Sequence, residues 1–293
     1  MFTPQAPNPA LAAVLTLLAS AFVAGTTLLA KALGTGALGP ALNPLQISQG
    51  RFLFAFIAFS LLITAIRPKI TRVHFGLHLG RSSFGWGGVT LMFAAASYIP
   101  LSDATAITFL NPVIGMMLAI PLLGEKVGPV RWTAAVIAIA GATLLLRPTP
   151  ASFEPAALIA LAAAVSMGIE LIFIKTLSGR EGPWQILFVN NAIGVVIATI
   201  AALFVWQAPN AAQWAALAAI GLMMAVAQTC FINAVARADA SFVAPFFYAT
   251  LVFAALYDAA VFGVLPDAVS VIGAGIILTG AGLLAWREAR LRV

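Results

Sequence analysis

Apolar residues run along this chain in long stretches that avoid charged side chains and end at proline, glycine, lysine or arginine. A helix needs about 20 mainly apolar residues to cross the hydrocarbon core of a bilayer. The pattern therefore predicts an all-α polytopic membrane protein with ten transmembrane helices. They are expected at residues 10–30, 45–66, 81–98, 104–122, 130–146, 155–175, 184–206, 211–235, 241–262 and 268–286.

The basic residues between these stretches predict the orientation. One side of the expected membrane carries Arg67, Lys69, Arg72, Arg81, Lys126, Arg131, Lys175, Arg180, Arg237, Arg287, Arg290 and Arg292, and the other carries Lys31, Arg51 and Arg147. Because cytoplasmic loops hold the excess of lysine and arginine, both termini are expected in the cytoplasm. The predicted location is the inner (cytoplasmic) membrane of a bacterial cell.

Composition supports this reading. The chain is 62% apolar and 8% charged, whereas a soluble domain carries roughly a quarter charged residues. The net charge of +6 is scattered between apolar stretches, so it predicts no nucleic-acid partner. With Cys230 as its one cysteine, the chain can form no internal disulfide bond.

The two halves of the chain resemble each other, which predicts one repeat over residues 1–148 and a second over 149–293. Three groups of residues recur in the second half. The first group is Pro44, Gln46, Ile47 and Arg51, which corresponds to Pro183, Gln185, Ile186 and Asn190. The second is Asp103 and Ala104, which corresponds to Asp239 and Ala240, and the third is Gly141, Ala142, Leu144 and Leu145, which corresponds to Gly280, Ala281, Leu283 and Leu284. Each half holds five expected helices, an odd number, so the second half is inverted in the membrane. Inverted repeats of this kind hold substrate between the halves and work by alternating access.

Four segments carry a resemblance to a known family: residues 44–51, LSDATAITFLNPV (101–113), LLGEKV (122–127) and DASFVAPFFY (239–248). On these residues the chain resembles ten-helix exporters of the EamA type in the drug/metabolite transporter superfamily, and within it the amino-acid exporters of the YddG type. The resemblance implies export of small metabolites through a central cavity lined by expected helices 1–4 and 6–9. The second half has FGVLPD (262–267) where Glu125 would have its counterpart.

Charged and amide side chains inside the expected spans are the first candidates for the substrate pathway, because such groups are costly in hydrocarbon. Arg51 can hold a carboxylate, or it can reach the interface or a neighbouring carbonyl. Glu170 can bind an ammonium group or a proton, or it can pair with Lys175 at the interface. Asn190 and Asn191 can bind a zwitterion, or they can join two helices.

Other polar and aromatic side chains are expected to complete the cavity. They are Tyr98, Asn111, Gln228, Asn233 and Tyr248. Pro112 and Pro245 predict kinks that face the cavity, since each removes a backbone hydrogen bond. Asp258, close to the end of the ninth stretch, is expected to be solvated.

Motifs typical of enzymes fail in their context. GTGALG (34–39) has the spacing of a dinucleotide fingerprint, but no strand precedes it. His74 and His78 have the spacing of a zinc helix, but Phe75 stands where a metalloprotease needs glutamate. The sequence therefore predicts no metal, no cofactor and no enzymatic activity. His78, with Glu170, is retained as a proton-sensitive candidate.

The predicted function is export of small metabolites, above all amino acids including aromatic ones, by alternating access. One alternative is an exporter of lipophilic cations and drugs, which would use Glu170. An alternative of another class is an intramembrane enzyme, but no nucleophile is paired with a base in the spans. The expected partners are a small-molecule substrate and the lipid bilayer, with the chain a monomer or a homodimer.

Overall fold

A computed structural model describes residues 8–68, 70–123, 128–146, 155–178, 180–237, 243 and 246–290. In this part of the chain the regular elements are all helices, which confirms the all-α prediction. They are α1 (Pro9–Gly34), α2 (Pro44–Ile66), α3 (Phe75–Ala96), α4 (Leu101–Thr108), α5 (Asn111–Leu123), α6 (Pro129–Leu146), α7 (Pro155–Ser178), α8 (Pro183–Leu203), α9 (Ala211–Val235), α11 (Ala249–Phe262) and α12 (Ala268–Arg290).

Many of these helices have the length and surface of membrane spans. Six described segments are long and apolar enough to cross a bilayer: α1, α2, α4 with α5 up to Leu122, α7, α8 and α9. Shorter apolar helices lie within α6, α11 and α12. Large apolar side chains such as Leu61, Val136 and Leu203 are exposed, as a lipid environment allows. The count of ten spans and the orientation of the termini stay predictions.

Asparagine and proline set several helix starts. The Asn43 side chain accepts a hydrogen bond from the Leu45 backbone N–H, and Pro44 occupies the first helical turn of α2, where no N–H is needed. Asn210 and Gln213 form a reciprocal capping box at the start of α9. At the other end of a helix, Gly263 adopts φ 67° and ends α11. Short polar signals thus fix where the apolar helices begin and end.

One predicted boundary was wrong, and one expected span is divided into two helices. Helix α3 begins at Phe75, six residues before the expected start, so Arg81 lies inside the helix and is buried. Its glycine-rich sequence looks like a loop, but the glycines allow close packing on α7. The fourth expected span is two helices, because the chain turns between Thr108 and Asn111, just before Pro112.

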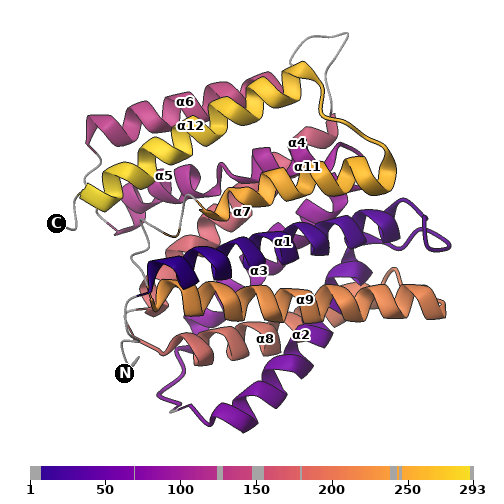
Figure 1. Ribbon diagram of the computed structural model, residues 1–293. Helices are drawn as coiled ribbons and strands as arrows, with labels where there is room; N and C mark the ends of the chain where they lie inside the picture. Colours follow the sequence, from indigo (N-terminus) through magenta and orange to yellow (C-terminus); the bar gives the residue numbers. More distant parts are fainter. Residues whose placement is uncertain are drawn as a thin grey trace.

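Helices from the two halves pack in matched pairs (Figure 1). Helix α3 lies along α7 and α1 lies along α9, while α2 packs on α8 and α6 on α12. By helix order, α1 corresponds to α7 and α3 corresponds to α9. The α3–α7 and α1–α9 contacts are therefore equivalent contacts between the halves. Helices α6 and α12 form a layer at the top of Figure 1, where Gly141 packs against the backbone of Gly273 and Ile277.

The described helices define two ends of the bundle. The inner end is where α1, α3 and α8 begin and α7, α9 and α12 end; the outer end is the opposite one. Helix α1 begins and α12 ends on the left of Figure 1. Glu125, Pro245 and the segment 239–242, which entered the sequence predictions, lie outside the described residues.

Candidate substrate site

Three charged side chains are largely buried in one region of the bundle. Arg81 of α3 lies with its Nε 3.7 Å from Glu170 Oε1 of α7, and both side chains are largely buried. Arg51 of α2 interacts electrostatically with both groups. Burying charge is costly unless it is paired, and a core with only a structural role would hold apolar side chains here. The buried charges therefore make this region a candidate functional site. This region holds two guanidinium groups and one carboxylate, which leaves one positive charge in excess.

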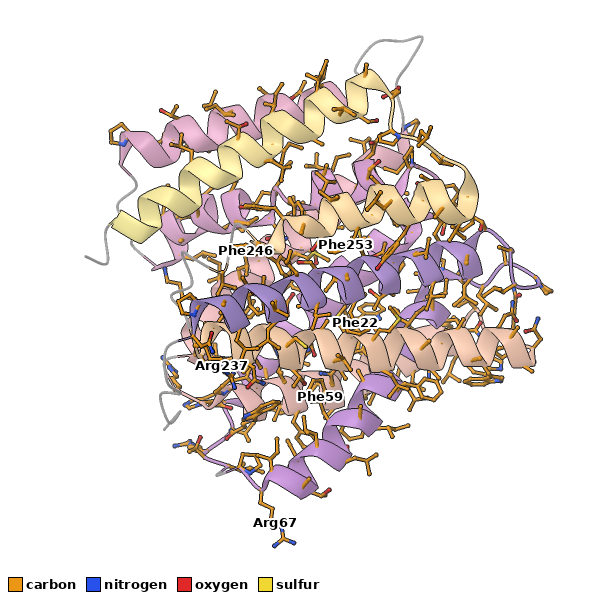
Figure 2. The ribbon with its side chains drawn as sticks, viewed as in Figure 1. Phe22, Phe59, Arg67, Arg237, Phe246 and Phe253 are labelled. Carbon is orange, nitrogen blue, oxygen red and sulfur yellow. The ribbon has the colours of Figure 1, made fainter. Side chains whose placement is uncertain are left out.

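Arg51 is the least satisfied member of the cluster. The residue is 4% exposed, and its guanidinium carbon lies 4.2 Å from the centroid of the Phe52 ring. Within the described residues, its Nε and Nη1 atoms have no hydrogen-bond partner. Arg67, by contrast, points away from the bundle at the end of the same helix (Figure 2). Arg51 therefore keeps free donors inside the protein.

Glycines of α3 make room for the carboxylate. A Cβ atom at Gly85 would lie 2.8 Å from both Cδ and Oε1 of Glu170, and one at Gly88 would lie 2.6 Å from Cγ of Met167. Side chains at these positions would displace Glu170 and Met167 of α7. The glycines thus allow Glu170 to lie against the backbone of α3, within reach of Arg81.

A cavity of about 370 Å³ adjoins this cluster at the inner end. Ligand sites are commonly about 300–1,000 Å³ with mainly apolar walls and a few polar groups. The walls come from the last turns of α7 and α9 and the first turns of α8, and Arg81 is the charged residue among the described lining. The lining residues are Arg81, Ile174, Ser178, Pro183, Ile186, Leu187, Phe231, Ile232, Val235 and Ala236.

The two adjacent asparagines of α8 lie on the same side of the bundle as the cluster. Asn190 Oδ1 accepts a hydrogen bond of 3.1 Å from Ser82 Oγ, next to Arg81 in the chain. Asn191 Nδ2 donates to the Leu187 carbonyl, while its buried Oδ1 has no partner in the described residues. Asn190 therefore joins α8 to α3, and Asn191 retains a free acceptor.

The remaining predicted residues are spread over the molecule. Tyr98 is 73% exposed just beyond α3 at the outer end. Asn111 begins α5, with Nδ2 4.0 Å from Met167 Sδ. Tyr248 stacks edge-to-face on Phe109, with ring centroids 5.4 Å apart. These residues are not among the hydrogen-bond and ion-pair partners of the charged cluster in the described part of the chain.

Two predicted residues of α9 differ in their surroundings. Asn233 Oδ1 accepts a hydrogen bond of 3.0 Å from Arg237 Nη1 at the inner end of the helix. Gln228 is half-buried, and its Oε1 has no partner among the described residues. Asn233 thus fixes the half-buried Arg237, whereas Gln228 keeps an acceptor available inside the bundle.

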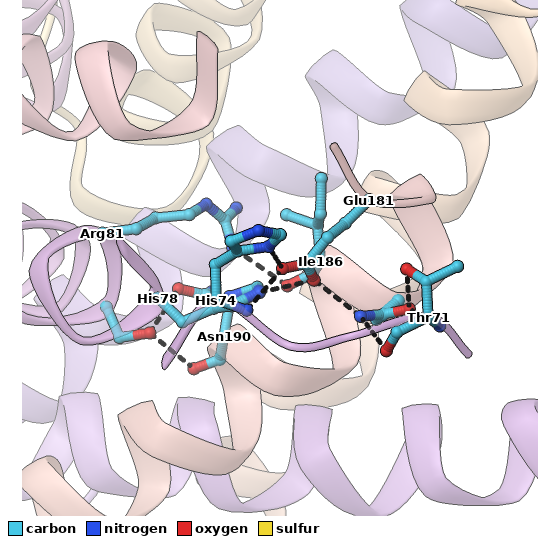
Figure 3. Close-up of polar contacts among 9 residues, drawn as sticks. Thr71, His74, His78, Arg81, Glu181, Ile186 and Asn190 are labelled. Atoms are coloured by element: carbon cyan, nitrogen blue, oxygen red, sulfur yellow. Dashed lines mark hydrogen bonds and ion pairs between the residues drawn. The ribbon is translucent and has the colours of Figure 1, made fainter. Parts of the chain in front are cut away.

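A second polar cluster lies at the inner end around Glu181, in the connection between α7 and α8 (Figure 3). Its Oε1 lies 2.9 Å from His74 Nδ1 and accepts a 2.8 Å hydrogen bond from the His74 backbone N–H. Its Oε2 lies 2.8 Å from His78 Nε2 and accepts a 2.7 Å bond from Gln185 Nε2. We call Glu181, His74, His78 and Gln185 the inner clasp. Burial raises the pKa of Glu181, but these hydrogen bonds outweigh it, and the net pKa is lowered.

An equivalent contact lies at the outer end. Asn210 Nδ2 donates to the Leu38 carbonyl and Gln213 Nε2 donates to the Pro40 carbonyl, joining the start of α9 to the connection between α1 and α2. We call these residues the outer clasp. It uses side-chain amides and backbone carbonyls, whereas the inner clasp uses two histidines and a carboxylate.

Lys31 and Asp258 form a buried ion pair near the outer end, with Nζ 2.5 Å from Oδ1. Asp258 Oδ2 also accepts a 2.8 Å hydrogen bond from the backbone N–H of Leu101. The pair joins α1 of the first half to α11 of the second and to the start of α4. The expectation that Asp258 is solvated was therefore wrong, because a cation 227 residues away along the chain compensates its charge.

Sequence reasoning missed Arg81 and Glu181. Arg81 was counted among the residues that set orientation, because the glycine-rich segment before it looked like a loop. Glu181 precedes Pro183 in a short connection, where an acidic residue has no periodic signal. The histidine spacing was the available clue, since His74 and His78 share one helix face and both contact Glu181.

With this geometry established, comparison with known proteins identifies the family. A model of the EamA-like transporter family matches residues 10–147 and again residues 154–286. The chain belongs to the EamA-like transporter family. Family membership and the helical bundle make it a multi-pass membrane transporter of small molecules rather than an enzyme.

Several transporters resemble the chain over most of its length. A riboflavin transporter of Vibrio cholerae is 32% identical over 78% of this chain and 77% of its own. An S-adenosylmethionine uptake transporter of Rickettsia prowazekii is 25% identical over 86% of each chain. The pseudopaline exporter CntI of Pseudomonas aeruginosa is 25% identical over 64% of this chain and 66% of its own. A solved crystal structure with 19% identity shares the fold, with a TM-score of 0.65 over 96% of this chain and 99% of that one.

Proposed function

We propose that this EamA-family transporter moves small zwitterionic metabolites of the amino-acid type, by alternating access around Arg51, Arg81 and Glu170. The observation that carries the proposal is this buried cluster, in which opposite charges stand on α3 and α7, helices from different halves of the chain. A zwitterion presents one group of each sign. Its carboxylate can therefore lie against the two arginines while its ammonium group lies against Glu170.

The cavity and one group of relatives support this proposal. The apolar walls formed by residues such as Ile186, Leu187 and Phe231 suit the side chain of an apolar amino acid. S-Adenosylmethionine, which the Rickettsia relatives take up, itself contains an amino-acid group. Because relatives are named for uptake and for export, the direction of net transport belongs to the test.

Riboflavin is the second candidate substrate. It is favoured by the 32% identity to the Vibrio cholerae riboflavin transporter and by the apolar cavity walls. Riboflavin has no carboxylate and no ammonium group, so it would leave the excess positive charge of Arg51, Arg81 and Glu170 uncompensated. The aromatic amino acids expected from the sequence stay within the first proposal.

The proposal also includes the location. We place the protein in a bacterial inner membrane with both termini in the cytoplasm, on the bias of lysine and arginine in the connections. The cavity would then open toward the cytoplasm, and Lys31 with Asp258 would lie near the periplasmic face. Cysteine labelling of Arg67→Cys and Phe204→Cys, at opposite ends of the bundle, in Cys230→Ser protein tests this orientation.

Counterflow in proteoliposomes tests the function. Vesicles are loaded with unlabelled phenylalanine, methionine, S-adenosylmethionine, riboflavin or tetraphenylphosphonium, and uptake of a trace of the same labelled compound is followed. Accumulation with the amino acids or S-adenosylmethionine supports the proposal. Accumulation with riboflavin alone supports the second candidate, and accumulation with the lipophilic cation alone contradicts both.

The same vesicles test direction. Imposing a substrate gradient, a pH gradient or a membrane potential in turn shows which of them drives net movement, and of which sign. Net movement only down the substrate gradient means facilitated diffusion. Accumulation driven by a proton gradient identifies a coupled transporter and makes Glu170 the first residue to test.

A further inference from the structure

We infer that Arg51 and Arg81 together form a carboxylate subsite, and that the anionic end of the substrate is the group the protein requires. The inference rests on the proposed function and adds which charge of the zwitterion is recognised, and by which residues. It concerns the excess positive charge of the cluster, which Glu170 alone does not compensate.

The unpaired donors of Arg51 are the first observation. A guanidinium carries five N–H groups in a rigid planar fork, and proteins rarely leave such groups without acceptors when they are buried. Arg51 is almost completely buried, yet its Nε and Nη1 have no partner in the described residues. These donors are suited to the two oxygens of one planar carboxylate.

Arg81 is the second observation. Its Nη1 donates 3.1 Å to the Ile186 carbonyl, which fixes the guanidinium at the cavity wall, as Figure 3 shows. Its Nε makes no hydrogen bond in the described structure, because 3.7 Å to Glu170 Oε1 is too long for one. Arg81 thus keeps a donor and lies where a molecule entering the cavity would meet it.

Charge balance explains why the anion is the required group. The cluster holds two guanidinium groups and one carboxylate, so adding one carboxylate makes it neutral. Adding an ammonium alone would raise the positive charge of a buried site, which is unfavourable in a low-dielectric interior. A substrate that keeps its carboxylate and loses its ammonium should therefore still bind. One that keeps its ammonium and loses its carboxylate should not.

Matched substrate analogues test this in the unaltered protein. Two series are used in competition against counterflow: L-phenylalanine, L-phenylalaninamide and N-acetyl-L-phenylalanine, and the same three forms of methionine. The amides are expected to compete about 10- to 100-fold more weakly than the acids, because they leave charged donors unpaired. The N-acetyl acids are expected to compete within a fewfold of the parent amino acids.

Arginine variants assign the effect to residues. Arg51→Gln and Arg81→Gln are expected to reduce the preference for acid over amide to within about threefold, and Arg51→Lys should restore part of it, since lysine keeps the charge but not the fork. Arg72→Gln removes an exposed positive charge from the connection between α2 and α3 and serves as the matched control. The measured quantity is the ratio of competition by the acid to competition by the amide in one protein sample. Partial loss of folded protein does not change this ratio.

Thermal unfolding of the purified protein in the presence of each analogue gives a second readout that needs no transport. A ligand that binds the folded protein raises the unfolding temperature. Stabilisation by acids and N-acetyl acids but not by amides supports the subsite. Equal stabilisation by acid and amide, or none by any acid, overturns it.

The two proposals fail in different ways. Transport or binding of N-acetyl acids but not of free amino acids would contradict the zwitterion proposal and leave the carboxylate subsite standing. Transport of amino acids and their amides alike would support an amino-acid-type transporter and overturn the subsite. Response to riboflavin alone would overturn both.

Discussion

Among single residues, Gly85 decides where the Glu170 carboxylate can lie. The carboxylate occupies the space that a side chain at position 85 would take. Protein interiors are close-packed, so even one added methyl group is felt when its neighbours cannot move. The position of one charge in the candidate site therefore depends on the absence of a side chain on the facing helix.

Gly85→Ala is predicted to raise the KM for substrate by about tenfold or more while the protein still folds. The new Cβ would lie 2.8 Å from Glu170 Cδ and would displace the carboxylate from Arg81. Concentration-dependent uptake measures the change. Gly87→Ala is the matched control, because a Cβ there meets only Ser166 Oγ at 3.2 Å. Equal effects of the two variants would refute this role of Gly85.

Glu181 gives a prediction about pH. Its folded-state pKa is lowered, so the clasp contributes stability that is fully present above the unfolded pKa and lost as pH falls through the folded pKa. Glu181→Gln should lower the unfolding temperature at neutral pH, by the equivalent of about 1–3 kcal/mol. The difference from the unaltered protein should shrink below about pH 4.5, since an unperturbed glutamate titrates near there.

Thermal unfolding in detergent from pH 8 to pH 3.5 measures this. Arg180→Gln, an exposed change in the same connection, controls for the loop itself. A difference between Glu181→Gln and the unaltered protein that stays constant down to pH 3.5 would show that the carboxylate charge does not support the clasp.

The sequence predicted candidate residues well where a rare residue type stood out in an apolar stretch. It predicted them poorly where the role of a residue depends on its contacts with other helices. Arg51, Glu170 and Asn190 were candidates because charged and amide groups are rare in apolar stretches, and the structure places them in or beside one cluster. Arg81 was hidden by a glycine-rich segment. The partner of Lys31 could not be read from local pattern, because Asp258 lies on a helix of the other half.

At the scale of helices, two glutamines show how the halves repeat. Gln46, in the first turn of α2, donates through Nε2 to the Gln207 carbonyl and accepts from the Gln207 N–H. Gln185, in the first turn of α8, makes the same pair of bonds with the backbone of Thr71. Each glutamine thus holds the connection that follows the other helix. The sequence match between residues 44–47 and 183–186 therefore corresponds to one contact made twice.

Gln46→Leu and Gln185→Leu are predicted to destabilise the protein by similar amounts, about 1–3 kcal/mol each, because each removes two hydrogen bonds between a buried side-chain amide and the backbone of a connection. Gln185→Leu should cost somewhat more, since Gln185 also donates to Glu181. Unfolding temperatures of the two variants, with the exposed Gln207→Leu as control, measure the effect. A large effect of one variant and none of the other would show that the two contacts are not equivalent.

For the whole molecule, the inner cavity and the Lys31–Asp258 pair lie toward opposite ends. The cavity is walled by the inner turns of α7, α8 and α9, while the ion pair holds α1, α4 and α11 together at the outer end. Under the alternating access proposed above, this arrangement would correspond to a transporter open at the inner end and closed at the outer end. Its outer closure rests on a buried charge pair, which is strongly destabilised when one partner is removed.

Asp258→Asn is predicted to weaken the outer closure and expose the outer end. In Cys230→Ser protein carrying Ser102→Cys, buried near this pair, modification by a membrane-impermeant thiol reagent should become at least about tenfold faster when Asp258 is changed. The exchanged variant Lys31→Asp with Asp258→Lys should return the rate toward its starting value. Unchanged labelling in Asp258→Asn would mean that other contacts hold this end closed.

The difference in chemistry between the inner and outer clasps has a consequence for turnover. Acid can loosen a carboxylate held by histidines, but it leaves amide-to-carbonyl bonds intact. Protons that bind and leave the inner clasp on the same side of the membrane do not cross it. They therefore supply no free energy for moving substrate. Protonation of Glu181 would then change only how quickly the protein cycles, while the steady-state ratio of substrate across the membrane would stay where the driving gradient puts it.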